Sequence, residues 1–178
     1  RTSSWARNAD NALPARVKCV GAYVNNRAAE LEAAADGYDG VLMLTQGGKL
    51  AEGSGACPFL LRDGRLVTPD VASDILESIT RATVIELARD ELGLEVVERA
   101  VDRSELWAAQ EAFWCGTGYE IQPIVGVDRI AVGDGRPGEV TRALQQRYFD
   151  VVHGRTVAHG AWRTPVYGGL EGPAVQAA

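Results

Sequence analysis

Residues 13–37 read LPARVKCVGAYVNNRAAELEAAADG, and their pattern changes partway along. From Ala22 to Asp36, alanine, leucine and glutamate recur at helical spacing, and Gly37 then ends the pattern as a glycine C-cap does. The stretch therefore predicts a helix over 22–36. Lys18, one of only two lysines in the chain, lies just before this helix.

Strand patterns follow this helix. Apolar runs separated by turn residues predict two hairpins, one around 46–48 and one around 63–64. Farther on, Ser73 or Asp74 can cap a helix. The full prediction has strands at 41–45, 49–51, 59–62, 65–68, 94–101, 113–115, 120–124 and 127–132, and helices at 22–36, from 73 or 74 to 92, at 104–110 and at 139–152. The Gly-, Pro- and Ala-rich end from Pro165 is expected to be poorly ordered.

Composition indicates one globular domain. With 178 residues, 46% hydrophobic content and no long apolar run, the chain can bury a core and gives no sign of a membrane partner. A net charge of −6 with scattered arginines provides no basic stripe for nucleic acid. The three cysteines form no CxxC pair, which predicts reduced thiols in a cytoplasmic protein and no metal site. No signal peptide is expected.

Lys18, Tyr23 and Glu52 provide the groups that a pyridoxal phosphate site needs. An amine forms the Schiff base, a phenol hydrogen-bonds the ring hydroxyl, and a carboxylate holds the pyridine nitrogen protonated. The glycines that follow Glu52, up to Gly55, would let the backbone approach the flat ring. The alternative is that Lys18 is an ordinary solvated lysine, because most lysines are exposed.

Several blocks of the chain carry a family pattern in the same order. They are LPARVKCVGAY (13–23), LAEGSGACPF (50–59), ILESITRATVIELA (75–88), FWCGTGYEIQPI (113–124) and GDGRPGEVTRALQQRYFDVVHG (133–154). In these blocks the chain resembles the large C-terminal domain of the class IV (fold type IV) aminotransferases, and among them the branched-chain amino-acid aminotransferases. The resemblance implies a mixed α/β (α+β) fold over residues 1–154, a β pseudo-barrel with surrounding helices, followed by a tail over 155–178.

The resemblance also implies roles for single residues. Lys18 would be the catalytic residue, because it would form the Schiff base with pyridoxal 5′-phosphate and then shuttle a proton. Tyr23 would bond the phenolic oxygen of the cofactor, and Glu52 would pair with its ring nitrogen. The other implied contacts are Gly55, Leu76 on the ring face, Ile79, Thr80 and Thr117 at the phosphate, and Thr117, Gly118 and Tyr119 at the substrate.

Most of these residues also have a plain structural interpretation. Tyr23 could be a buried helix tyrosine, and Glu52 could be a solvated turn carboxylate. Thr80 could lie inside one continuous helix, and residues 117–119 could be an ordinary turn between strands. The sequence alone leaves these alternatives open.

The segment Gly-Asp-Gly-Arg-Pro-Gly at 133–138 matches the GxGxxG dinucleotide fingerprint between a strand and a helix. No second strand of a βαβ unit follows that helix, so we interpret the segment as a structural loop. His153 and His159 have no partner spaced for a triad or a metal, which favours surface or packing roles.

The implied reaction is transamination between an amino acid, branched-chain-like or otherwise hydrophobic, and a 2-oxo acid such as 2-oxoglutarate. An aminodeoxychorismate lyase-like enzyme, a D-amino-acid aminotransferase and a non-catalytic half remain alternatives. The small N-terminal domain of the family is absent from this chain, so we expect a homo-oligomer such as a homodimer, or a complex with a separate small-domain chain. Two positions depart from the family pattern: Cys57 replaces an asparagine, and Tyr119 would narrow the pocket.

Overall fold

The computed structural model of the chain describes residues 1–166. The chain divides into two compact units, Arg1–Tyr148 and a shorter one that begins at Phe149. The first unit holds every described strand and every candidate cofactor or substrate residue named above. Of the C-terminal end that we expect to be poorly ordered, residues 167–178 lie outside the described residues. The domain boundary at 154 stays a prediction.

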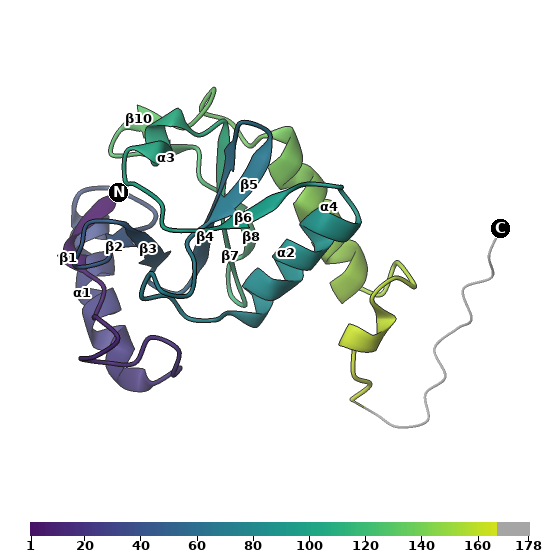
Figure 1. Cartoon of the computed structure of the whole chain (residues 1–178), viewed down its shortest axis with the longest axis horizontal. Coiled ribbons are helices and arrows are strands. Elements are labelled where there is room, and N and C mark those ends of the chain that lie inside the picture. Colours follow the sequence, from purple (N-terminus) through teal and green to yellow (C-terminus); the bar gives the residue numbers. More distant parts are fainter. Residues whose placement is uncertain (167–178) are drawn as a thin grey trace. The chain divides into compact units, whose positions relative to one another are not determined.

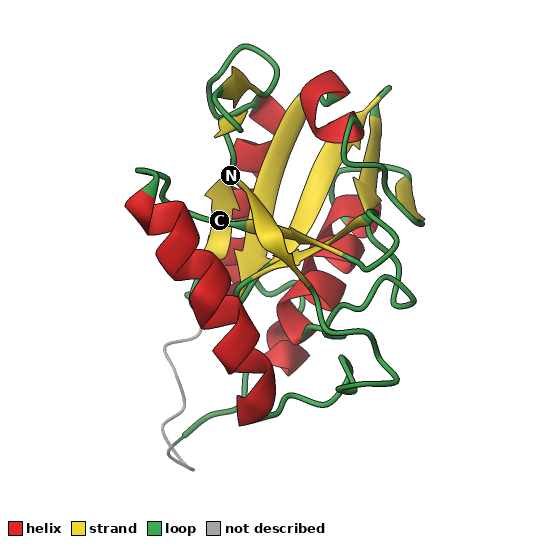
Figure 2. Ribbon diagram, turned by 90° about the vertical axis from the view of Figure 1, so that its left-hand side faces the viewer, coloured by secondary structure: helices red, strands yellow, loops and turns green. Residues whose placement is uncertain are grey.

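A three-stranded sheet carries the first helix. β1 (Thr2–Ala6) pairs in parallel with β2 (Leu42–Leu44), and β2 pairs antiparallel with β3 (Leu50–Gly53). α1 (Val20–Ala35) packs against β1, and Figure 2 shows it as the long helix nearest to the viewer, with the strands behind it. The helix predicted at 22–36 is confirmed, with small shifts of both ends.

A larger sheet has the strand order β6-β5-β4-β7-β8 and is covered by α2, which packs against β7 and β6 (Figure 1). Both predicted hairpins and the mixed α/β class are confirmed. The remaining bounds are β4 Cys57–Arg62, β5 Arg65–Thr68, α2 Ile79–Asp90, β6 Val96–Glu98, α3 Glu105–Ala108, β7 Glu111–Gly116, β8 Glu120–Pro123, β9 Gly126–Val127, β10 Ile130–Ala131, α4 Glu139–Val152 and the short 3-10 helix Gly160–Trp162.

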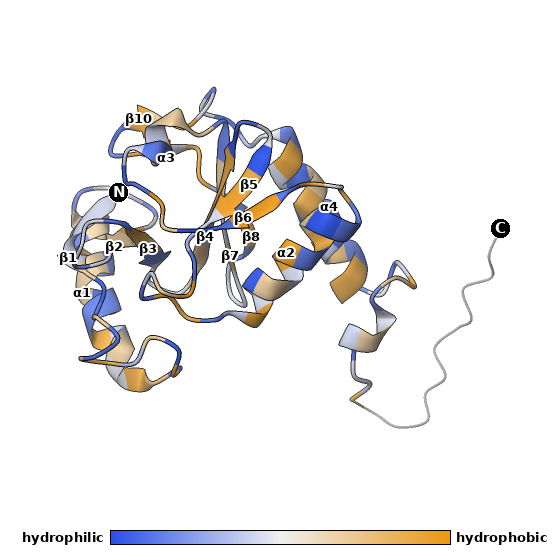
Figure 3. Ribbon diagram, viewed as in Figure 1, coloured by the Kyte–Doolittle hydropathy of each residue, from blue (hydrophilic) through white to orange (hydrophobic). Residues whose placement is uncertain are grey.

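The larger sheet supplies much of the core. Figure 3 shows most of β5 and β6 in the orange of hydrophobic residues. Phe59 and Phe113 face each other across β4 and β7, and their rings stack with a centroid distance of 5.2 Å and an interplanar angle of 4°. Both side chains are fully buried, and burial of an aromatic side chain is among the larger favourable contributions to folding.

The predicted start of the second helix is wrong. α2 begins at Ile79, and its N-cap is Ser78, whose Oγ accepts a hydrogen bond from Arg81 N at 3.3 Å. Asp74 has a φ of 55°, which lies in the left-handed region and outside a helix start. Leu76 N instead donates to the Glu52 carboxylate at 3.2 Å. This long-range hydrogen bond holds the preceding segment out of the helix.

The strand predicted at 127–132 is also wrong, because it folds back as the β9–β10 hairpin. Asp128 and Arg129 have φ values of 52° and 65°, the positive values that a tight two-residue hairpin turn requires. Asp128 accepts hydrogen bonds from Thr2 N at 2.7 Å and from Arg103 Nη2 at 2.9 Å. These contacts stabilise an aspartate in a backbone conformation that glycine or asparagine would adopt more readily.

The chain turns tightly between β3 and β4, close to the end of β7. A Cβ atom on Gly53 would lie 2.9 Å from the Trp114 ring, and a Cβ atom on Gly116 would lie 2.8 Å from Gly55 O. Neither position has room for a side chain. The glycines therefore allow residues 52–57 to pack directly beside the end of β7.

Glu111 caps helix α4. Its carboxylate accepts hydrogen bonds from Val140 N at 3.1 Å, from Thr141 N at 2.8 Å and from Thr141 Oγ1 at 2.7 Å. These N–H groups lie in the first turn of the helix, where a fingerprint site would bind a dinucleotide phosphate. Because a protein carboxylate takes this place, the segment 133–138 is a structural loop, as the sequence indicates.

We expect Glu111→Ala to lower the free energy of unfolding by about 1–2 kcal/mol, because the first turn of α4 loses its acceptor. Denaturant unfolding of the whole chain measures the effect. Glu139→Ala is the matched control, since Glu139 is an exposed acidic residue in the same turn and interacts mainly with the helix dipole. Equal losses in the two variants would show that Glu111 acts only through its charge.

Candidate active site

One pocket of the first unit, called here the Lys18 pocket, collects most of the predicted site residues. It lies between the loop that precedes α1, the β3–β4 turn, the segment before α2 and the turn after β7. The predicted residues that line it are Lys18, Tyr23, Glu52, Gly55, Leu76 and Thr117. The other lining residues are Arg7, Ala15, Val17, Cys19, Ala22, Asn26, Ser54, Ala56, Cys57, Ser78 and Gly116.

Lys18 and Tyr23 bring free polar groups to this pocket. Lys18 stands directly before Cys19, the extended N-cap residue of α1, and Tyr23 follows early in the helix. Both residues are exposed, Tyr23 by 43%. Within the described residues, neither the Lys18 amine nor the Tyr23 hydroxyl has a hydrogen-bond or ion-pair partner. Tyr23 is therefore not a buried helix tyrosine, and both groups are available to a ligand.

Glu52 is a buried carboxylate at the end of β3, with only 6% of the residue exposed. Its Oε1 lies 2.5 Å from Arg7 Nη2, and its Oε2 accepts a hydrogen bond from Leu76 N at 3.2 Å. Burial raises the pKa of the Glu52 carboxyl above its ordinary value, and the Arg7 guanidinium acts against this rise. Glu52 is therefore not a solvated turn carboxylate.

Arg7 and Asn26 belong to the pocket but were missed by the sequence analysis. Arg7 is 4% exposed, and its Nη1 donates to Asn26 Oδ1 at 2.8 Å. Asn26 is a polar residue inside a helix, where asparagine is less favourable than alanine. This was the one signal in the sequence that could have suggested a buried polar role. Nothing in the local pattern distinguishes Arg7 from the other arginines.

Ile79 and Thr80 stand in the first turn of α2, next to the pocket-lining Ser78. The interpretation of Thr80 as an interior residue of a long helix is wrong, because the helix starts at Ile79. The first N–H groups of a helix have no acceptor within it and attract anions. The Ile79 side chain is 87% exposed, so its backbone rather than its side chain suits a ligand contact. Their phosphate role stays a prediction.

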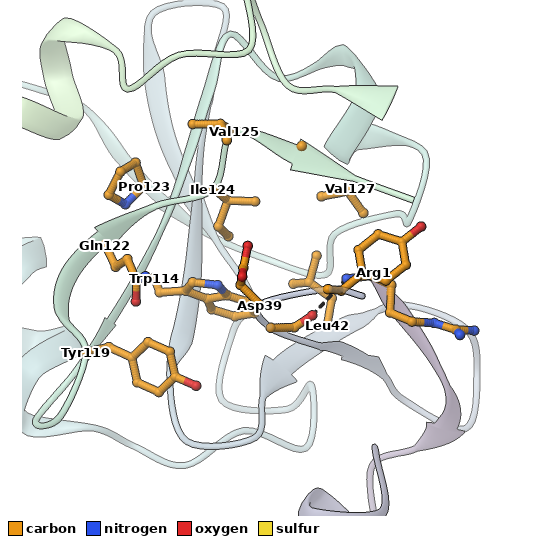
Figure 4. A pocket seen from close by; sticks show the side chains of 13 residues that line it. Arg1, Asp39, Leu42, Trp114, Tyr119, Gln122, Pro123, Ile124, Val125 and Val127 are labelled. Atoms are coloured by element: carbon orange, nitrogen blue, oxygen red, sulfur yellow. Dashed lines mark hydrogen bonds between the residues drawn. The ribbon is translucent and has the colours of Figure 1, made fainter. Parts of the chain in front are cut away.

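The turn after β7 divides the three residues predicted to bind substrate. Thr117 lines the Lys18 pocket, whereas Gly118 and Tyr119 do not. The Tyr119 ring packs at a tilt against Trp114, with centroids 6.4 Å apart, and lines a second pocket (Figure 4). Asp39, Ile124 and Val127 also line this second pocket, so Tyr119 is turned toward it. A substrate role for Gly118 and Tyr119 stays a prediction.

The histidines of the second unit take packing positions. His153 stacks on Phe149 with ring centroids 5.7 Å apart, and His159 lies 4.1 Å from the Trp162 ring. In the described part of the chain, no three His, Cys, Asp or Glu side chains gather as a metal site would need. Within residues 1–166, none of the helices combines the length and the apolar character needed to cross a membrane.

A free lysine amine, a buried carboxylate and a helix N-terminus around one pocket are typical of enzymes that bind a cofactor through lysine. The particular family follows from comparison with known proteins. The model of the amino-transferase class IV family matches residues 1–127, and the chain belongs to this family.

Similar proteins are branched-chain aminotransferases. The chain is 45% identical to a protein of Aquifex aeolicus named "Probable branched-chain-amino-acid aminotransferase", over 94% of this chain and 54% of the relative. It matches the branched-chain amino acid aminotransferase of Thermobaculum terrenum in its PLP-form with a TM-score of 0.91 and 52% identity, over 93% of this chain and 54% of that chain. A branched-chain amino acid aminotransferase from the organism abbreviated T.th., complexed with 4-methylvaleric acid, matches with a TM-score of 0.90 and 40% identity, over 93% and 55%.

These comparisons cover only part of each relative. The chain spans about half the length of the curated relatives it matches. The activity, substrates and partners of the whole protein are therefore treated as proposals below.

Proposed function

We propose that this chain carries the pyridoxal 5′-phosphate site of an aminotransferase that exchanges amino groups between a branched-chain or other hydrophobic amino acid and a 2-oxo acid such as 2-oxoglutarate. The observation that carries the proposal is that the free amine of Lys18 and the buried carboxylate of Glu52 line one pocket. The first turn of α2 begins at the edge of that pocket.

The donor set of the Lys18 pocket fits this cofactor. Lys18 has an amine with no partner among the described residues, and Glu52 keeps a buried carboxylate at the pocket wall. Gly55 and Gly116 leave room for a flat ring, because the wall there has no side chains. When bound, pyridoxal phosphate would supply an aldehyde for an amine and a ring that accepts electrons.

The residues of the chain would divide the work. Lys18 would attach the cofactor covalently and then move the proton of the substrate Cα. Glu52 would hold a proton on the ring nitrogen, and Tyr23 would donate to the ring oxygen. Leu76 would pack on the ring face, where an apolar side chain excludes water.

The phosphate would bind at the edge of the pocket. The N–H groups of Ile79 and Thr80 stand at the positive end of α2, which favours an anion. Thr117 would add a hydroxyl donor from the turn after β7. These are neutral donors, so we propose that residues beyond the matched half of the relatives complete the phosphate contact and close the pocket over the substrate.

The branched-chain substrate class is supported by the similar proteins. One of them binds 4-methylvaleric acid, a carboxylic acid with a branched apolar chain. The names of the relatives favour this class over the aminodeoxychorismate lyase-like and D-amino-acid alternatives. We further propose a cytoplasmic homo-oligomer or a complex with a separate small-domain chain; the three free cysteines are consistent with a reducing compartment.

Borohydride trapping tests the proposal. The chain is saturated with pyridoxal phosphate, reduced with borohydride and digested, and the attached group is located by mass spectrometry. We expect it on the peptide that contains Lys18. Lys49 is a built-in control, because its ammonium is ion-paired with Asp102 at 2.5 Å outside the pocket. Attachment to Lys49 instead, or no attachment under saturation, would reject the function and favour a non-catalytic half.

A further inference from the structure

A buried arginine stands behind the Glu52 carboxylate. Arg7 follows β1, and its guanidinium makes contacts in several directions. Nη2 lies 2.5 Å from Glu52 Oε1, Nη1 donates to Asn26 Oδ1 at 2.8 Å, and Nε donates to Asp74 O at 3.2 Å. Because a guanidinium is planar and rigid, these contacts fix its orientation toward Glu52.

Asn26 connects Arg7 to the rest of the pocket. Its Oδ1 accepts from Arg7, and its Nδ2 donates to Ser54 O at 2.6 Å. Only 6% of Asn26 is exposed, so both ends of the amide are used in a buried network. The network joins α1, the segment after β1 and the β3–β4 turn, and these elements form the wall that contains Glu52.

Glu52 keeps acceptor capacity toward the pocket. Oε1 contacts Arg7, while Oε2 accepts from Leu76 N at 3.2 Å and has Cys57 Sγ at 3.8 Å. A carboxylate has about four acceptor positions, so at least one remains for a donor in the pocket. Burial raises the pKa of the Cys57 thiol to about 12, so this thiol is a neutral neighbour and adds no charge.

Two opposing effects decide the charge of Glu52. Burial favours the neutral acid, and Arg7 favours the carboxylate. The other titratable groups that face this site are the Cys57 thiol and, across the pocket, the Lys18 amine. A neutral Glu52 would itself donate a hydrogen bond and could not hold a proton on a ligand.

We propose that Arg7, oriented by Asn26, is a positioning residue that keeps Glu52 as a carboxylate acceptor directed at the pocket. The identity of the donor, a protonated ring nitrogen, rests on the proposed function. The ionisation of Glu52 is a property of the ligand-free chain and can be measured without the cofactor.

The test follows the Glu52 carboxyl by ¹³C NMR during a pH titration of the ligand-free chain, with Glu52→Gln to assign the signal. In Arg7→Met we expect the midpoint to move to higher pH by about one unit or more, because a positive charge in contact with the carboxylate is lost. In Arg7→Lys and Asn26→Ala we expect smaller movements in the same direction. Arg99→Met is the matched control, since Arg99 pairs with Glu105 at 2.6 Å away from the pocket.

A midpoint in Arg7→Met equal to that of the unchanged chain, or an equal movement in Arg99→Met, overturns the inference. If Arg7→Met does not fold, Arg7→Lys and Asn26→Ala decide, and no movement in either one overturns it. The proposed function fails separately: a moved midpoint without trapping at Lys18 removes the cofactor assignment and leaves the role of Arg7 intact. Trapping at Lys18 with an unmoved midpoint has the opposite meaning.

Discussion

Lys18→Arg is expected to abolish covalent attachment of pyridoxal phosphate and to lower transamination by the native protein by about 10²- to 10⁴-fold. Arginine keeps the positive charge, but a guanidinium is not deprotonated in proteins, so it can neither attach an aldehyde nor move the substrate proton. Borohydride trapping measures the attachment, and amino transfer from leucine to 2-oxoglutarate measures the activity.

Lys49→Arg is the matched control for this change. Lys49 is the other lysine of the chain, and arginine can keep its ion pair with Asp102. We expect this variant to trap the cofactor and to transaminate like the unchanged protein. Turnover retained in Lys18→Arg, or lost equally in Lys49→Arg, would remove Lys18 from the mechanism.

Glu52→Gln is expected to keep the fold and the attachment at Lys18, but to slow the amino-transfer half-reaction by about 10²- to 10³-fold. The glutamine oxygen can still accept a hydrogen bond from Arg7, which limits the structural damage. A neutral amide cannot hold a proton on the ring nitrogen, so the ring becomes a poorer electron acceptor. Single-turnover kinetics with a good amino donor measure the rate, and a cofactor titration measures binding.

Glu98→Gln is the control for the loss of a carboxylate that pairs with a buried arginine. Glu98 lies 2.9 Å from Arg81 and does not line the Lys18 pocket. We expect little change in the half-reaction of this variant. If Glu52→Gln reacts as fast as the unchanged protein, Glu52 has no part in proton transfer.

Local patterns predicted much of the fold correctly. The helix α1 follows from helical spacing that ends at a glycine, and the two hairpins follow from turn residues between apolar runs. Each of these elements depends on residues close together in the chain, so its signal is visible in a short window. The predicted place of Glu52 at a strand end was correct for the same reason.

The errors lie where distant contacts decide. Ser73 and Asp74 are good N-cap types, yet α2 starts at Ile79, because Leu76 N is held by Glu52 from another strand. The strand predicted at 127–132 became a hairpin whose Asp128 is bound by Thr2 and Arg103. In both cases a tertiary hydrogen bond outweighed a weak local preference.

The sequence by itself determined the family pattern and the principal reactive groups, since Lys18, Tyr23 and Glu52 are recognisable from residue type and spacing. Only the tertiary structure decided that the Lys18 and Tyr23 polar groups have no described partner while Glu52 is buried against Arg7. It also placed Asn26 behind Arg7 and turned Tyr119 toward a second pocket. The physical reason is that burial and ion pairing depend on which distant segments pack together, and periodicity along the chain reports only on neighbours.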